Sequence, residues 1–230
     1  MRLMARMEAE MSEYADGVQG HVRIVANTSA ITQFLPEDLS LFTHRYPDIR
    51  VALSEQTSER AVQDAVKGLA DIAIFSEAVS PQELETFPYR QDRLVVIAPD
   101  GHPLSGKKSI RFVDTLGYQH VGLQPGSSLL EQLQSQAREL ERAISLAIQV
   151  TSFDGVRRMV ESGLGIAVLP DGAVLPNVAK DRLSVIPLAD AWAKRKLLIG
   201  VRDAHALTLC ARNMLANLTG IQIRTRGKKS

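Results

Sequence analysis

Several residue types that mark particular classes of protein are scarce in this sequence. Cysteine occurs once, at Cys210, so no disulfide can form within the chain, which is typical of a reducing compartment. The 27 basic and 26 acidic residues leave a formal net charge of +1, without the basic excess that is typical of a nucleic-acid-binding surface. The residues 223–230 are locally basic, and we interpret them as a solvated basic tail.

Long apolar runs are missing as well. No stretch contains the ~18 apolar residues in succession that a membrane-spanning helix needs. Residues 1–11 carry charges at Arg2, Arg6, Glu8 and Glu10 and have no apolar centre, so they do not have the pattern of a signal peptide. We therefore expect a cytoplasmic protein with no membrane partner.

The short motifs of catalysis, metal binding and cofactor binding do not occur. The five histidines show no HExxH spacing, and there is no G-x-S-x-G elbow, Walker loop or CxxC pair. We interpret the dispersed carboxylates as helix caps or surface charges: Asp71, Asp92, Asp114 and Asp154. Cys210 lies on an apolar face with Met214 and is expected to pack in the core. We expect no enzyme, no catalytic residue, no metal and no cofactor.

What is present is a regular alternation of strands and helices. Strands are expected at 22–26, 49–53, 71–75, 94–98, 120–123, 146–150, 166–169, 183–186 and 197–201. Helical patterns lie between them, the first running without a break to Tyr46, where Pro47 ends it. Such alternation predicts βαβ units and an α/β fold with a mainly parallel sheet.

The segment ESGLGIAVLP at 161–170 contains a pair of glycines that could suggest a phosphate loop. A phosphate loop requires the order strand, glycines, helix. Here a helix precedes the glycines and a strand follows them, so Gly163 is expected to end a helix with positive φ and Gly165 to allow close packing. The same helix–glycine–strand order at Gly68 indicates two similarly wound halves.

Four strand-to-helix junctions share small hydroxyl residues, at 27–29, 57–58, 127–128 and 151–152. Each would place hydroxyls and backbone N–H groups at the positive end of a helix dipole, and Ser128 with Glu131 fits a capping box. Ordinary N-capping explains any one junction. A binding site for a small anion or polyol is indicated only if several junctions converge on one cleft.

The ordered set of motifs resembles the effector-binding domain of LysR-type transcriptional regulators. The matching stretches are 20–55 (GHVRIVANTSAITQFLPEDLSLFTHRYPDIRVALSE), 61–75 (AVQDAVKGLADIAIF), 89–104 (YRQDRLVVIAPDGHPL) and 152–170 (SFDGVRRMVESGLGIAVLP). The resemblance covers roughly residues 18–220. It implies a fold like the type 2 periplasmic binding proteins, with a ligand cleft between two α/β subdomains and two hinge crossovers. Subdomain I is expected at 18–93 and 196–222, and subdomain II at 94–195.

The resemblance also implies a site for a small organic effector, typically a carboxylate. Its expected ligand-binding residues are Thr28, Ser29, Ala30, Ser58, Phe75, Ser76, Gln124, Ser127, Ser128, Ser152 and Phe153. Hydroxyls and backbone N–H groups would hold the carboxylate, while Phe75 and Phe153 would cover the apolar part of the effector.

Residues 1–17 resemble the end of the linker helix that follows the winged helix-turn-helix of this family. We therefore expect DNA binding only through an N-terminal domain outside this sequence, and a homodimer whose parent protein is a dimer or tetramer. The main alternative is a solute-binding protein of a transporter, against which the missing export signal argues. An enzyme on the same scaffold is a further alternative, without an assignable acid–base pair.

Overall fold

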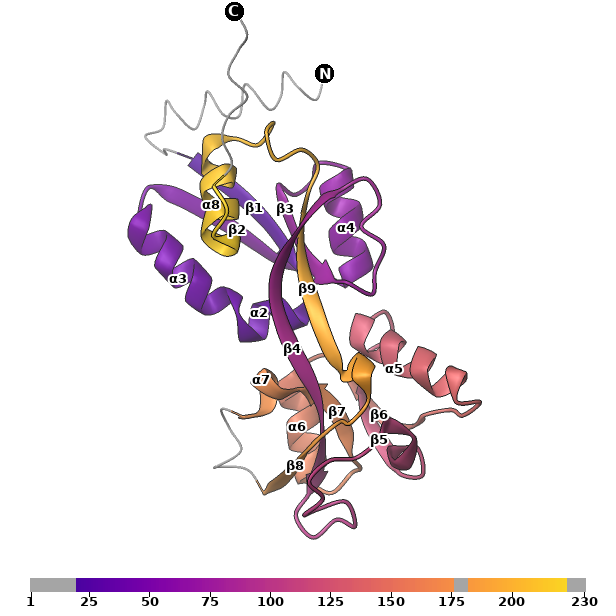
Figure 1. The fold of residues 1–230 in the computed structure, drawn as a ribbon. Helices are drawn as coiled ribbons and strands as arrows, with labels where there is room; N and C mark the ends of the chain where they lie inside the picture. The colour runs from indigo at the N-terminus through magenta and orange to yellow at the C-terminus, as the bar shows by residue number, and fades with distance from the viewer. Residues whose placement is uncertain (1–19, 176–181, 223–230) are drawn as a thin grey trace, which may run out of the picture. The chain divides into compact units, whose positions relative to one another are not determined.

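The computed structural model describes residues 20–175 and 182–222. The predicted linker end at 1–17 and the predicted basic tail at 223–230 lie outside these residues. The described residues form two compact units: unit 1 holds 20–75, 80–89 and 197–222, and unit 2 holds 76–79, 90–175 and 182–196. The chain crosses between the units within strand β4, Glu85–Pro99, and near the start of strand β9, Lys194–Val201 (Figure 1).

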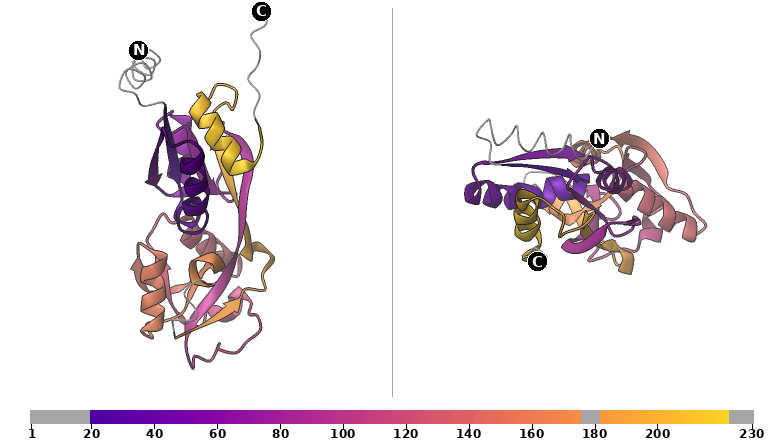
Figure 2. Two further views of the ribbon diagram at one scale, coloured as in Figure 1. Left: turned by 90° about the vertical axis from the view of Figure 1, so that its left-hand side faces the viewer. Right: turned by 90° about the horizontal axis from the view of Figure 1, so that it is seen from above.

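Unit 1 is built on three parallel strands. Strand β1, Gly20–Ala26, pairs with β2, Ile49–Glu55, on one side and with β3, Ile72–Ser76, on the other, and β9 follows β3 in the sheet. The helices are α2 (Thr28–Gln33), α3 (Leu35–Arg45), α4 (Ser58–Val66) and α8 (Leu209–Thr219). Helix α8 packs against β1 and lies beside α3 (Figure 2), closing a core of apolar side chains such as Ile24, Phe42 and Met214.

The prediction of one unbroken helix up to Tyr46 is wrong, because the helix is interrupted at Phe34. Phe34 has φ −125°, ends α2 and precedes α3, and Pro36 lies in the first turn of α3. In a continuous helix Pro36 would have no N–H to donate and its ring would meet the preceding turn. At the start of a new helix the missing N–H costs nothing.

Unit 2 contains antiparallel as well as parallel pairing, so the prediction of a mainly parallel sheet is wrong for this unit. Strand β4 pairs in antiparallel fashion with β7, Ala167–Pro170, and with β8, Leu183–Pro187. Strands β5, Gln119–Leu123, and β6, Ser145–Val150, form a separate parallel pair. Buried apolar strands look the same in sequence whichever way they run, and only the tertiary pairing decides the direction.

The helices of unit 2 lie against these strands. They are α5 (Ser128–Glu139), α6 (Phe153–Glu161) and the short α7 (Asp171–Val174), with 3₁₀ turns η1 (Phe112–Thr115) and η3 (Ala191–Ala193). No helix of the described residues has the length and apolar content to cross a membrane.

The two glycines of the segment ESGLGIAVLP have the predicted roles. Gly163 has φ +80° just after α6, and its N–H donates to the carbonyl of Val160 at 2.9 Å. A Cβ on Gly165 would lie only 2.6 Å from the carbonyl oxygen of Gln119, so the chain passes β5 too closely for any side chain. These glycines therefore end a helix and start a strand, as predicted.

Two of the dispersed carboxylates are buried and belong to ion pairs, which corrects their prediction as caps or surface charges. Asp92 accepts hydrogen bonds from the guanidinium of Arg195, with Nε 2.8 Å from Oδ1, and their side chains are 1% and 4% exposed. Asp71 is buried and accepts two hydrogen bonds from the side chain of Arg23, which raises the pKa of that guanidinium. The local sequence does not indicate that Asp92 pairs with an arginine 103 residues away.

Candidate functional site

In unit 1 the first two hydroxyl-rich junctions converge at one edge of the sheet. Because β1 and β2 are parallel and Ala26 pairs with Glu55, the chain leaves both strands at the same edge and enters α2 and α4 there. Asn27 is the N-cap of α2, where its Oδ1 accepts from the N–H of Ala30 at 3.0 Å. Its Nδ2 donates to Oγ of Ser58 at the start of α4, also at 3.0 Å. One buried amide therefore joins the two helix N-termini.

The predicted binding residues of unit 1 are mostly buried. Ser29, Ala30 and Ser58 are all buried, and Thr28 is half-buried. The hydroxyl of Thr28 donates to the carboxylate of Glu55 at 2.6 Å. An acidic side chain thus lies beside the α2 N-terminus and opposes the attraction of an anion by the helix dipole.

The end of β3 carries the remaining predicted residues of this region. Phe75 is fully buried, and a Cβ on Gly200 would come within 2.8 Å of its ring, so the ring packs against the β9 backbone. Oγ of Ser76 accepts from the N–H of Ala78 at 3.3 Å. The ring of Phe75 is therefore part of the packing of its own unit.

In unit 2 the other two junctions converge in the same way. Strands β5 and β6 are parallel, with Leu123 opposite Val150, and the N–H of Gln124 donates to the carbonyl of Val150 at 2.9 Å. Helices α5 and α6 therefore begin side by side. Gln124 and Ser152 are exposed, Ser127 and Ser128 are half-buried, and Phe153 is buried in the core of the unit.

The caps of these two helices differ. Oγ of Ser152 accepts from the N–H of Gly155 at 3.1 Å, as predicted for α6. The capping box predicted for Ser128 is wrong, because the N-cap of α5 is Ser127, whose backbone is extended and whose side chain makes no cap bond. The turn at Pro125 and Gly126, closed by a bond from the N–H of Ser127 to the carbonyl of Gln124, starts the helix one residue earlier.

The first turn of α6 carries its own charges. Asp154 accepts from Arg157 and Arg158, and these hydrogen bonds hold the pKa of its carboxyl below the usual range. A carboxylate near the helix N-terminus is favourable. Its negative charge also weakens the positive potential of the helix N-terminus, which would otherwise attract an anion.

Sequence reasoning placed Asn27 in a capping junction, but it assigned neither Asn27 nor Glu55 to the binding site. The signal for Asn27 was present, because asparagine is a preferred N-cap residue. Its bond to Ser58 depends on the pairing of β1 with β2 and has no local signature. Among the described residues no group of histidine, cysteine or acidic side chains is placed to hold a metal ion.

The family of the chain follows from comparison with known sequences. The model of the LysR substrate binding domain matches residues 15–220, and the chain belongs to this family. A probable RuBisCO transcriptional regulator of Trichormus variabilis is 27% identical over 192 residues, which cover 80% of this chain and 57% of that protein. The regulator CysL of Bacillus subtilis is 27% identical over 200 residues, covering 85% and 65%. The chain thus spans little more than half the length of the first of these relatives.

Solved structures confirm the predicted α/β fold, which is that of LysR effector-binding domains and of the type 2 periplasmic binding proteins. The regulatory domain of CcmR from Synechocystis in complex with 2-PG superposes with a TM-score of 0.80 at 24% identity, covering 89% of this chain and 98% of that one. The effector-binding domain of QuiR in complex with shikimate gives 0.76 at 18% identity, covering 88% and 97%. Both sequence relatives are described as transcriptional regulators.

Proposed function

We propose that this chain is the ligand-sensing domain of a LysR-type transcription regulator and binds a small organic anion at the N-termini of its helices. The observation that carries the proposal is the convergence of two helix N-termini in each unit, at residues 27–30 with 57–58 and at 124–128 with 151–153. Helix N-termini offer unpaired N–H groups and a positive dipole end to an anion. Two solved relatives are described with shikimate and with benzoate, both of which are carboxylates.

The proposed binding residues divide by exposure into two kinds. The exposed and half-exposed polar side chains that would contact the effector are Thr28, Gln124, Ser127, Ser128 and Ser152. The buried residues Ser29, Ala30, Ser58 and Ser76 would act through their backbone N–H groups and by holding the helix ends in place. Phe75 and Phe153 are buried in their units, so only a small part of each ring would contact an effector.

The charges at the site favour modest affinity from any single helix. A helix N-terminus contributes about 0.3–1 kcal/mol toward a nearby negative charge. Glu55 beside α2 and Asp154 in the first turn of α6 both oppose an anion. Tight binding therefore requires that several helix N-termini act on the same effector.

Effector binding would act on the regulator by shifting an equilibrium. An effector favours the conformation that it binds more tightly, and it shifts the population only by its difference in affinity for the two conformations. In a homodimer this shift would pass to DNA-binding domains in the longer parent protein. The chain itself would act in the cytoplasm, next to DNA that it contacts only through that domain.

The proposal is tested by thermal unfolding of the chain in the presence of shikimate, benzoate, other small carboxylates, sugars and inorganic anions. An effector at about a hundred times its Kd adds roughly 2.7 kcal/mol of stability. The shift should disappear in the double variant Ser128→Ala, Ser152→Ala, and should persist in Thr43→Ala, which removes an exposed hydroxyl from the body of α3. If the double variant keeps the ligand-induced shift in Tm, the effector binds at another site.

A further inference from the structure

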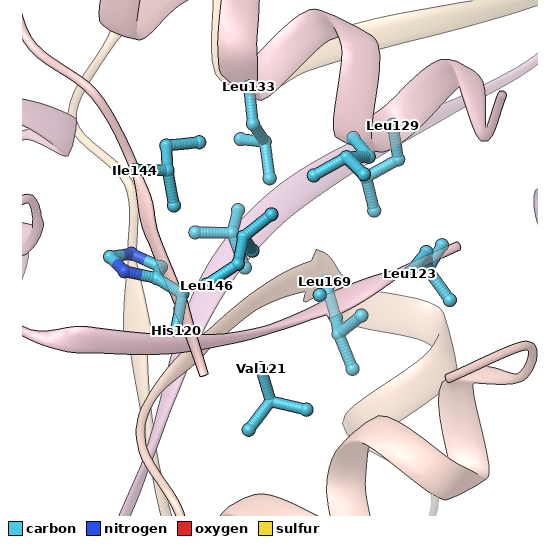
Figure 3. A pocket seen from close by; sticks show the side chains of 11 residues that line it. His120, Val121, Leu123, Leu129, Leu133, Ile144, Leu146 and Leu169 are labelled. Atoms are coloured by element: carbon cyan, nitrogen blue, oxygen red, sulfur yellow. The ribbon is translucent and has the colours of Figure 1, made fainter. Parts of the chain in front are cut away.

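Unit 2 contains a small cavity beside β5, lined in part by the first turn of α5. Its wall consists of apolar side chains from β5, α5, β6, the segment before β6, and β7, including Leu123, Leu129, Ile144, Leu146 and Leu169. Of the eleven residues that line it, His120 alone has a polar side chain. The cavity measures about 10 Å³, roughly the room that one water molecule needs. Figure 3 shows the imidazole of His120 beside Ile144 and Leu146.

The hydrogen bonding of His120 determines which ring nitrogen carries the proton. The ring is buried, with 2% exposure, and its Nδ1 lies 3.0 Å from the carbonyl oxygen of Tyr118. A carbonyl can only accept, so Nδ1 must carry the hydrogen and donate. In the neutral ring Nε2 is then a bare acceptor.

Nε2 has no hydrogen-bond partner within the part of the chain that the structure describes. The remaining residues that line the cavity have apolar side chains or, at Gly122, none, so their side chains cannot donate to it. A buried acceptor that is left without a partner is costly, whereas a partner that fits the space removes this cost. The partner must be a donor, it must be small, and it must enter an apolar space.

We propose that this cavity is a binding site for one hydroxyl group, which donates to Nε2 of His120. The same chemistry is available from a water molecule and from a small alcohol. The volume favours water, whereas the apolar wall and the half-buried Leu146 on β6 favour the alkyl part of an alcohol. The site uses other side chains than the proposed effector site but adjoins it, because Leu123 precedes Gln124 and Leu129 follows Ser128.

Occupancy of the site would stabilise one specific part of unit 2. His120 pairs with Leu146 of β6 and forms an isolated bridge to Ile166 before β7. A hydroxyl on Nε2 therefore satisfies the acceptor at the point where these segments meet. Loss of the bound group should loosen β5 first and the more distant β4–β8 pair last.

The test combines NMR of the wild-type chain with a matched pair of variants. In His120→Asn the side-chain amide can still donate to the carbonyl of Tyr118 but the Nε2 acceptor is lost, whereas His120→Gln retains a polar group near Nε2. The ¹⁵N shifts of the wild-type imidazole should show a protonated Nδ1 and a hydrogen-bonded, unprotonated Nε2. Because this measurement uses the wild type, it remains decisive if either variant fails to fold.

The two sources of the hydroxyl are separated by titration with ethanol. A saturable change at Nε2, with a higher Tm that His120→Asn abolishes, identifies an alcohol site. No response to ethanol, together with cross-relaxation between the His120 ring and a long-lived water, identifies a water site. A protonated Nε2, or an Nε2 whose shift is that of a free lone pair, would overturn the proposal.

Discussion

Asn27 and Ser58 belong to different helices, and a 3.0 Å hydrogen bond from Nδ2 of Asn27 to Oγ of Ser58 joins them inside unit 1. The same amide caps α2 through its oxygen. Both halves of one amide are therefore used, one for a local cap and one for a contact across 31 residues of sequence. This residue sets the relative position of two helix N-termini that we propose as part of the effector site.

Two substitutions of Asn27 should distinguish the contributions of its two hydrogen bonds to stability. Asn27→Ala removes both the cap and the donor to Ser58, and we expect it to lower the free energy of unfolding by about 1–3 kcal/mol. Asn27→Asp keeps the cap acceptor but loses the donor, so its loss should be smaller. Urea unfolding measures the free energy of unfolding of both variants, with Thr43→Ala as the control. Equal losses for Ala and Asp would show that the bond to Ser58 contributes most of the effect.

The buried pair of Asp92 and Arg195 should be far more sensitive to substitution than an exposed pair. Arg195→Met removes the guanidinium from the buried carboxylate of Asp92, and such changes cost about 3–5 kcal/mol. The exposed pair of Arg111 and Asp114 is the matched control, because Arg111→Met should cost less than about 1 kcal/mol. Chemical denaturation distinguishes these values. A loss near that of the control would show that water reaches Asp92.

Stability should fall on acidification through His120. Burial holds the pKa of this imidazole below its ordinary value of 6.5, although the bond to Tyr118 partly opposes the shift. Below pH 6.5 the unfolded chain takes up a proton that the folded chain does not. The stability contribution is therefore complete above that pH and is lost as the pH falls toward the folded pKa, at up to about 1.4 kcal/mol per pH unit.

Comparison with a variant isolates this effect from the other titrating groups. The difference in unfolding free energy between wild type and His120→Asn should shrink between pH 7 and pH 5. His102, whose pKa burial also lowers, is retained in both proteins and cancels. A difference that stays constant with pH would mean that His120 titrates alike in the folded and unfolded chains.

The close approach at Gly165 should make it less tolerant than Gly163, although both have positive φ. A Cβ at Gly165 would meet the carbonyl oxygen of Gln119 at 2.6 Å, whereas a Cβ at Gly163 meets nothing within 4 Å. Gly163→Ala should therefore cost about 1–2 kcal/mol for its backbone conformation alone. Gly165→Ala should cost clearly more, because backbone must move. Thermal unfolding of the two variants ranks them, and equal Tm values would contradict this packing.

We expect the chain to form a homodimer through the edge of unit 1 that contains α3 and β2. Strand β2 is an edge strand of the sheet. Leu41 on α3 and Leu53 on β2 are exposed. Unpaired edges and exposed leucines together favour association. Light scattering of the wild type should give the mass of a dimer at micromolar concentration. Leu41→Lys should lower this mass, whereas the control Leu209→Lys on α8 should leave it unchanged. A monomer mass for the wild type would contradict the dimer.

Much of this molecule is determined locally. The alternation of apolar strands and capped helices, the glycines at 163 and 165 and the hydroxyls at the helix starts are read from neighbouring residues, because periodicity, capping and positive φ depend on short-range geometry. These signals were sufficient for the α/β class and for three of the four capped junctions. They failed at α5, where the turn at Pro125 and Gly126 moved the cap from Ser128 to Ser127.

The tertiary structure decided everything that depends on partners distant in sequence. Strand direction in unit 2, the pairing of Asp92 with Arg195, the amide bridge from Asn27 to Ser58 and the burial of His120 have no local signature. Each is set by which strands become neighbours, and burial then makes an unpaired charge or acceptor expensive. Residue types and their spacing determined which helices and strands form, whereas packing determined which of their polar groups meet.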